Sequence, residues 1–267
     1  MTEPENIVTM QEETLPQKKR VWEVDFLRGI LILFVVWDHL MFDFMSLPFS
    51  TEFFQTIARF ATEYQTSALR TGVHRYFLIG FVGLSGVSCA LSRNNWKRGV
   101  KMLGFAYGLT LCTILLRALG GGDFVIRFNV LHVIAYGVLM TELLRSLKLS
   151  RAVWLLACVV MLFVGEAWLV KPVALPEWLF FLGNSQAANR LSPGDFLPLL
   201  PYLGWLFLGA LAGEKIYAAK TSVFENRCPK LTRPLEFCGR HSLAIYLGSQ
   251  VAMYGILYLF TVVWGIF

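Results

Sequence analysis

Long apolar runs recur along this chain and restrict its fold more than any other feature. Each run extends over about 20 residues, the length that an α-helix needs to cross the hydrocarbon core of a bilayer. The runs are continuous rather than alternating, which argues against a transmembrane β-barrel. Hydrophobic residues make up 56% of the 267 residues and charged residues only 16%, unlike a soluble domain. The sequence therefore predicts an all-α fold, a polytopic helical bundle integral to the membrane.

About seven runs are long enough to be transmembrane helices, and an amphipathic segment follows the first. In this segment, 50–72, apolar residues recur at helical spacing between charged ones, as in a helix at the membrane interface. Residues 1–20 are expected to form a disordered cytoplasmic tail, and residues 21–267 a single membrane domain. The predicted spans are about 26–47, 75–92, 96–117, 125–146, 151–170, 196–218 and 240–263.

Lysine and arginine gather in alternate loops, which predicts the orientation of the chain. The basic loops are those before the first span and after the second, fourth and sixth spans. We therefore expect a multi-pass protein of the cell (inner) membrane, with its N-terminus in the cytoplasm and its C-terminus outside. The net charge of +6 comes mostly from these loops, so nucleic acid is not an expected partner.

Glycines recur within three of the spans at intervals that suit close packing of helices in a membrane. We interpret them as packing positions rather than ligand contacts. They are Gly80, Gly83, Gly86, Gly104, Gly108, Gly204, Gly209 and Gly213.

The first span carries ionisable side chains, which makes it the main functional candidate. Such groups are rare in lipid and usually mark functional sites. Arg28 and His39 are eleven residues apart, which on a helix returns to nearly the same face about 16 Å further along the axis. The loop charges put Arg28 near the cytoplasm and His39 in the outer half. Asp43, four residues after His39, is placed to bond one imidazole nitrogen and leave the other as a base.

Other polar residues are weaker candidates. His132 near the start of the fourth span has either a structural role or a site role. Asp195 is expected chiefly to cap the sixth span, and His74 to lie at the membrane interface. Arg240 and His241 begin the last span, where free N–H groups suit a phosphate or the side chains simply cap the helix. With no histidine pair in one span and no regular cysteine spacing, no metal is expected.

Several of these residues fall in motifs that resemble the transmembrane acyltransferase superfamily. The chain is most similar to bacterial members of the heparan-α-glucosaminide N-acetyltransferase catalytic-domain family. The matching motifs begin near residue 21 and end near residue 250. They are Glu23-Val-Asp25-Phe-Leu-Arg28-Gly-Ile with a histidine ten residues on, Phe81-Val-Gly83-Leu-Ser85-Gly86-Val-Ser88, Asn129-Val-Leu131-His132, Asp195-Phe-Leu-Pro198-Leu-Leu-Pro201-Tyr-Leu-Gly204 and Gly239-Arg240-His241-Ser242-Leu-Ala-Ile-Tyr246.

The resemblance implies acetyl transfer from cytoplasmic acetyl-CoA to a sugar or glycolipid acceptor reached from the other side. It implies that His39 is the active histidine and that Arg28, grouped with Asp25, holds the donor. Arg240 and His241 would add phosphate contacts, Asp43 would orient His39, and His132 would be a candidate oxyanion donor. A homodimer could complete the site.

Two other functions fit part of the sequence. A proton-coupled transporter would use the intramembrane Asp, His and Arg as a relay, although the chain has no evident internal repeat. A catalytically inactive scaffold of the same fold is the other alternative. Bacterial relatives often have a His-Gln pair where this chain has Ser249-Gln250, which leaves room for a loss of chemistry.

Overall fold

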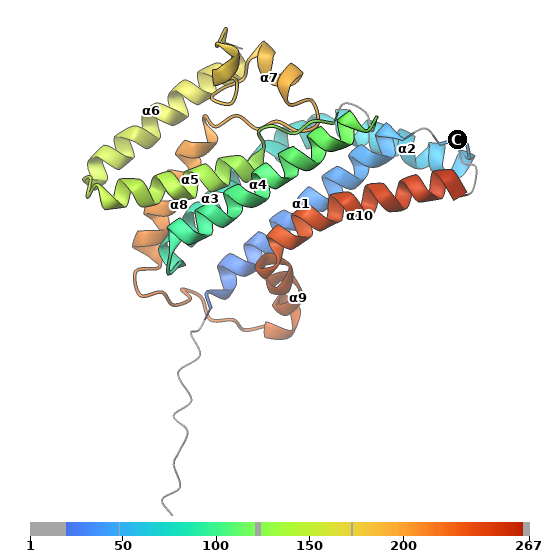
Figure 1. Ribbon diagram of the computed structural model, residues 1–267. Helices are drawn as coiled ribbons and strands as arrows, with labels where there is room; N and C mark the ends of the chain where they lie inside the picture. Colours follow the sequence, from blue (N-terminus) through green and yellow to red (C-terminus); the bar gives the residue numbers. More distant parts are fainter. Residues whose placement is uncertain (1–19, 48, 121–123, 172, 264–267) are drawn as a thin grey trace, which may run out of the picture.

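The computed structural model describes residues 20–47, 49–120, 124–171 and 173–263 of the chain. It is a bundle of α-helices (Figure 1), and its described residues contain no β-strand beyond one bridge between Phe128 and Phe196. The tail predicted over residues 1–20 lies outside the described residues, apart from residue 20. The helices are α1 (Trp22–Ser46), α2 (Glu52–Thr66), α3 (Ala68–Leu91), α4 (Asn95–Ala118), α5 (Val130–Ser146), α6 (Arg151–Val170), the 3-10 helix η1 (Glu177–Leu179), α7 (Gln186–Leu191), α8 (Tyr202–Ile216), α9 (Pro229–Arg240) and α10 (Ser242–Val263).

Each of the seven predicted spans corresponds to a helix, which confirms the helical membrane bundle. Four described helices, α1, α3, α4 and α6, are long and apolar enough to cross a bilayer. Helices α5 and α8 are shorter, with 17 and 15 residues, because each begins later than predicted. In Figure 1, α10 lies alongside α1, while α9 packs against the first turns of α1.

The amphipathic segment ends earlier than predicted, and this changes the start of the second span. Helix α2 ends at Thr66, and Ser67 caps α3 by accepting a hydrogen bond from the Arg70 backbone N–H at 3.1 Å. The span therefore begins at Ala68 instead of near residue 75. As a result, Arg70 and His74 lie on the first turns of α3 and not in an interfacial helix.

Two irregular segments, residues 124–129 and 192–201, replace the first turns predicted for the fourth and sixth spans. They lie next to each other, joined by hydrogen bonds from Gly194 N to Val125 O and from Leu197 N to Phe128 O. Irregular backbone at membrane depth is tolerated where protein surrounds it and satisfies its polar groups. These segments end the regular helices and bring two polar residues, Asn129 and Asp195, into the bundle.

Glycines allow α3 and α8 to approach closely. A Cβ atom on Gly86 would lie 2.0 Å from Leu206 O, and one on Gly209 would lie 2.1 Å from Gly83 O. These contacts confirm the packing prediction for the second and sixth spans. The prediction is wrong for Gly104 and Gly108 on α4, because nothing described lies within 4 Å of a Cβ added at either position.

Candidate active site

Two cavities among the described residues are lined in part by α1. One, of about 420 Å³, is lined by polar residues of α1, α3 and α10 and by an aromatic wall that includes Phe34 and Phe77; we call it the histidine cavity. The other, of about 560 Å³, lies at the N-terminal end of α1 and is lined by Arg28 and Arg98; we call it the arginine cavity. Both volumes suit a small organic ligand.

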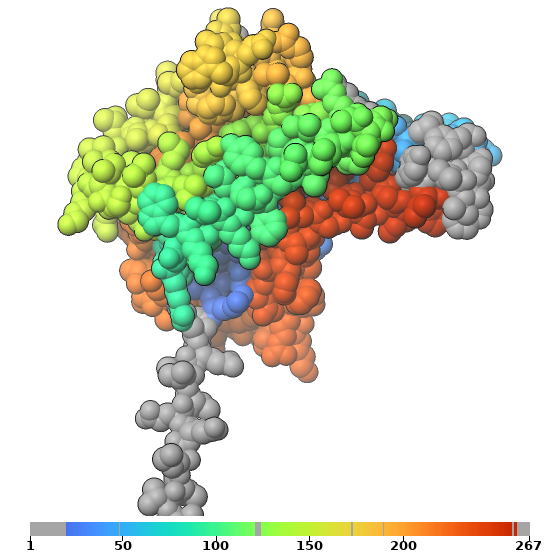
Figure 2. Space-filling view, viewed as in Figure 1, coloured from blue at the N-terminus to red at the C-terminus, as the bar shows by residue number. Residues whose placement is uncertain are grey.

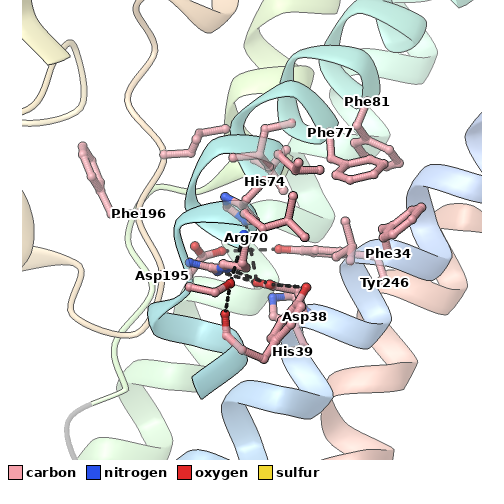
Figure 3. A pocket seen from close by; sticks show the side chains of 18 residues that line it. Phe34, Asp38, His39, Arg70, His74, Phe77, Phe81, Asp195, Phe196 and Tyr246 are labelled. Carbon is pink, nitrogen blue, oxygen red and sulfur yellow. Dashed lines mark hydrogen bonds and ion pairs between the residues drawn. The ribbon is translucent and has the colours of Figure 1, made fainter. Parts of the chain in front are cut away.

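An ion pair between α1 and α3 forms part of the histidine cavity (Figure 3). Arg70 donates two hydrogen bonds to the Asp38 carboxylate, and His74 Nε2 lies 3.7 Å from Asp38 Oδ2. Helix α2 adds Gln65, whose side chain donates to the Asp38 carbonyl at 2.9 Å, and Tyr64, 3.4 Å from Oδ1. Burial and the nearby Asp38 charge raise the pKa of the Tyr64 phenol. Asp38 is thus held from two helices beside His39.

His39 lines the same cavity but has a different neighbour from the one expected. The structure contains no hydrogen bond between His39 and Asp43: His39 Nδ1 is buried without a partner among the described residues. Asp43 instead accepts a hydrogen bond from Gln250 Nε2 on α10 at 3.2 Å. Spacing on one helix brings two side chains near each other, but here a residue from another helix takes the carboxylate. The expected orientation of His39 by Asp43 is therefore wrong in its geometry.

Asp195 and Tyr246 complete the polar part of the histidine cavity. Asp195 lies in the irregular segment before α8, six residues before Pro201, the residue that precedes the helix. It therefore does not cap that helix, and the capping prediction is wrong. The Tyr246 hydroxyl lies 3.5 Å from Asp195 Oδ2 and accepts a hydrogen bond from Asn129 Nδ2 at 3.0 Å. The Tyr246 and His39 ring centroids are 6.1 Å apart.

His132 lies outside this cavity. It is fully buried and forms a capping box with Asn129 at the start of α5. Its Nδ1 lies 3.0 Å from Asn129 Oδ1, and its ring stacks on Phe128. The structure thus gives His132 a local role in holding Asn129, and it does not bring His132 to the cavity wall as a candidate oxyanion donor.

The arginine cavity concentrates positive charge. Arg28, Arg98, Arg20 and Lys220 line it, and Asp25 is the one carboxylate among its lining residues. Arg28 donates to the Ser88 hydroxyl and lies 3.7 Å from Asp25. Four cations with one carboxylate leave a surplus that suits the phosphates of an anionic ligand. Asp25 thus balances the arginines and is less suited to contact an anion itself.

Arg240 and His241 were expected beside Arg28, but neither lines the arginine cavity. Arg240 is exposed and donates from Nε to Glu236 O at 3.2 Å, although its charge is close enough to act on Asp25. The His241 ring packs on Phe237 with centroids 4.3 Å apart. Helix α9 ends at Arg240, and His241 follows it as the C-cap; both residues are exposed.

An apolar layer lies between the two cavities. On α1 the residues after Arg28 and before Phe34 line neither cavity, and on α3 the same is true between Phe81 and Ser88. Ile32 and Val82 in these stretches are both 0% exposed and belong to the main hydrophobic core. Figure 2 shows part of α1 in blue, recessed between α4 and the C-terminal helices.

Sequence reasoning missed Arg70, Tyr246 and Arg98 as site residues. Asp38 offered a signal, because a carboxylate within a span needs a cation at the same depth, and Arg70 follows in the next span. Tyr246 and Arg98 gave no comparable signal, since their neighbours in the site are distant in sequence. Among the described residues, no group of three or more His, Cys, Asp or Glu side chains is arranged to hold a metal ion.

Comparison with known proteins identifies the family of the chain. The family model described as "Heparan-alpha-glucosaminide N-acetyltransferase, catalytic" matches residues 20–251, most of the chain. Neither the curated proteins nor the solved structures contain a significant match. The matched range includes Arg28, His39, Asp195 and Tyr246, and with them the polar residues of both cavities.

Proposed function

Because the chain belongs to the heparan-α-glucosaminide N-acetyltransferase catalytic-domain family, we propose that it transfers an acetyl group from acetyl-CoA to a sugar or glycolipid acceptor. Family membership makes it a membrane acetyltransferase; the donor, the acceptor and the residues involved are our proposal. One observation carries it: α1 has Arg28 in a cationic cavity and His39 in a second cavity eleven residues further on. This spacing corresponds to about 16 Å along a helix.

The arginine cavity is the proposed donor site. The phosphates of the donor bind Arg28 and Arg98, and the extended pantetheine arm follows α1 toward His39. An arm of this kind is long enough for a separation of about 16 Å. The Ile32–Val82 layer moves aside as the arm enters, because the side chains of this layer fill the path when no donor is bound.

His39 is the proposed general base. An imidazole nitrogen takes the proton of the acceptor hydroxyl or amine as that group attacks the thioester carbonyl. A new C–O or C–N bond forms, the C–S bond breaks, and the imidazolium returns the proton to the departing thiolate. Asp38 and Asp195 line the same cavity as His39.

The orientation follows from the loop charges. Lysine and arginine gather at the end of the bundle that holds the arginine cavity, which supports a cytoplasmic N-terminus and a donor taken from the cytoplasm. The histidine cavity then lies in the outer half of a cell membrane, where an envelope sugar or glycolipid is within reach. Transfer would thus deliver acetyl groups to the outer side of the membrane, while the donor itself stays on the cytoplasmic side.

The test uses purified protein in lipid nanodiscs with radiolabelled acetyl-CoA and candidate amino-sugar and glycolipid acceptors. We expect His39→Ala to reduce acetyl transfer by about 10²- to 10⁴-fold, the usual contribution of a general base. His241→Ala is the matched control, since this exposed imidazole lines neither cavity and should leave the rate unchanged. A His39→Ala enzyme with wild-type turnover would sink the proposal, and donor binding without turnover by the wild type would identify a scaffold.

A further inference from the structure

The Tyr246 phenol is a polar group of the histidine cavity to which the proposed mechanism gives no role. Tyr246 lies on α10, is 8% exposed, and faces His39 across the cavity (Figure 3). A buried tyrosine hydroxyl normally has a hydrogen-bond partner for both its lone pair and its proton. In Tyr246 the oxygen has a well-placed hydrogen-bond donor, whereas the proton has only a distant acceptor.

Asn129 fixes the oxygen of the phenol. Its amide nitrogen donates to Tyr246 Oη at 3.0 Å, so one lone pair of the phenol is in use. The amide cannot easily turn, because its Oδ1 accepts from the Leu131 backbone N–H at 3.1 Å and contacts His132. The capping box at the start of α5 thus orients Asn129, and Asn129 orients the hydroxyl.

The proton of the phenol is held loosely. Among the described residues, it is directed to Asp195 Oδ2 at 3.5 Å, well beyond the 2.7–2.8 Å typical of an O–H···O bond. An acceptor that enters the cavity and lies closer to the hydroxyl would therefore take this hydrogen bond, and only the long contact with Asp195 would be lost. The hydroxyl is a pre-oriented donor beside the base, in a cavity with an aromatic wall.

We propose that Tyr246 donates a hydrogen bond to the carbonyl oxygen of the donor thioester and stabilises the oxyanion that develops there. This rests on the proposed acetyl transfer. As the acceptor attacks, the C=O electron pair moves onto oxygen, the Tyr246 proton remains on the phenol as a hydrogen bond, and the pair returns when the C–S bond breaks. A donor fixed before the reaction is effective because it need not reorganise as charge develops.

His132 is then a positioning residue, which acts through Asn129. It holds the amide that aligns Tyr246, but it does not touch the reacting atoms. The motif at Asn129–His132 and the motif that ends at Tyr246 are more than 110 residues apart in sequence, yet this hydrogen-bond chain joins them. The two motifs therefore act together to position the Tyr246 hydroxyl.

The experiment reads the thioester carbonyl directly by isotope-edited infrared spectroscopy of bound [¹³C-carbonyl]acetyl-CoA. The full-length protein carries His39→Ala, which prevents turnover. We expect the carbonyl band to shift to lower frequency on binding, and Tyr246→Phe to abolish that shift while donor affinity stays the same. Tyr202→Phe is the matched control, because Tyr202 is equally buried, 5% exposed, and lines neither cavity; its band should remain shifted.

Kinetics with His39 intact provide a second readout. Tyr246→Phe should lower kcat by about 10²- to 10³-fold and leave the KM for acetyl-CoA unchanged, as for other oxyanion donors. Asn129→Ser keeps a residue that can cap α5 but removes the amide, so it should cause a smaller loss in kcat. This variant keeps the test valid if Tyr246→Phe fails to fold.

The outcomes separate the two proposals. A band that stays shifted in Tyr246→Phe, or a kcat that is unchanged in both variants, would overturn the role of Tyr246 and leave acetyl transfer intact. A wild-type protein that binds no acetyl-CoA would overturn the proposed function and this inference together.

Discussion

Arg70 on α3 holds Asp38 on α1 by two hydrogen bonds, from Nε to Oδ1 at 2.9 Å and from Nη2 to Oδ2 at 2.6 Å. The side chains are largely buried, 23% and 14% exposed. A two-pronged bond fixes the relative orientation of its partners as well as their distance. This pair therefore sets the spacing of the two helices that form the walls of the histidine cavity.

Asp38→Asn should lower the free energy of unfolding by about 3 kcal/mol, because it leaves the Arg70 charge buried without a counter-ion. The double variant Asp38→Leu/Arg70→Met should recover most of that loss, since no unpaired charge remains. Denaturant unfolding in detergent measures both. Glu177→Gln is the control: its ion pair with Arg190 is exposed, and its loss should change stability by less than about 1 kcal/mol. A double variant as unstable as the single one would contradict this account.

Arg28→Ala and Arg98→Ala should each weaken acetyl-CoA binding by about 10- to 100-fold, the value of a hydrogen bond to a charged group. Isothermal titration in nanodiscs gives the dissociation constants. Arg240→Ala removes the same charge from the same end of the bundle, but Arg240 lines neither cavity. The affinity of this variant for acetyl-CoA should therefore match that of the wild type. Equal losses for Arg28→Ala and Arg240→Ala would place the donor elsewhere.

Arg20 and Lys220 are exposed at the rim of the arginine cavity and should act on the rate of donor association. The double variant Arg20→Gln/Lys220→Gln should lower the association rate several-fold and leave dissociation nearly unchanged, because rim charges chiefly steer encounter. Stopped-flow binding at low and high salt measures this, and the difference should shrink at high salt. Lys97→Gln/Lys101→Gln removes equal charge from α4 outside the cavity and serves as the comparison; an equal effect there would indicate net charge alone.

Gly86→Ala and Gly209→Ala should each lower stability by about 1–3 kcal/mol, because the added methyl group meets backbone oxygen of the facing helix. Gly104→Ala and Gly108→Ala should instead be neutral or raise stability by about 0.5–1 kcal/mol, since α4 has space there and alanine favours a helix. Thermal unfolding of the four variants side by side tests the contrast. Equal effects on both pairs would contradict the packing described for α3 and α8.

Much of the fold could be predicted because apolar run length has a direct physical meaning in lipid. The positions of Arg28 and His39 also followed from one helix: eleven residues return to the same face, and the two side chains line two cavities at different depths. What could not be predicted depends on contacts between distant segments. The bond of Gln250 to Asp43, which replaced the expected pairing with His39, joins residues 207 apart in the chain.

The predicted starts of the fourth and sixth spans were also wrong, because α5 and α8 begin later. The predicted fourth and sixth spans begin with apolar residues that belong to irregular segments in the structure. Hydropathy does not distinguish an apolar extended segment from an apolar helix. Hydrogen bonds between the two segments, and from their backbone N–H groups to Thr113, Ser192 and the 181–182 carbonyls, stabilise this irregular backbone. Asp195 thereby lies beside the histidine cavity instead of at the start of a helix.

The layer of Ile32 and Val82 has a consequence for the cell as well as for the enzyme. Water-filled hollows that reach toward each other from opposite faces of a membrane would form a pore if they met, and ions would leak down the membrane potential. Side chains without polar atoms leave no place for a hydrated ion or a chain of water molecules. In the proposed orientation, Ile32 and Val82 would separate the donor cavity from the acceptor cavity, so that the protein could receive ligands from both sides while the membrane stays closed to ions.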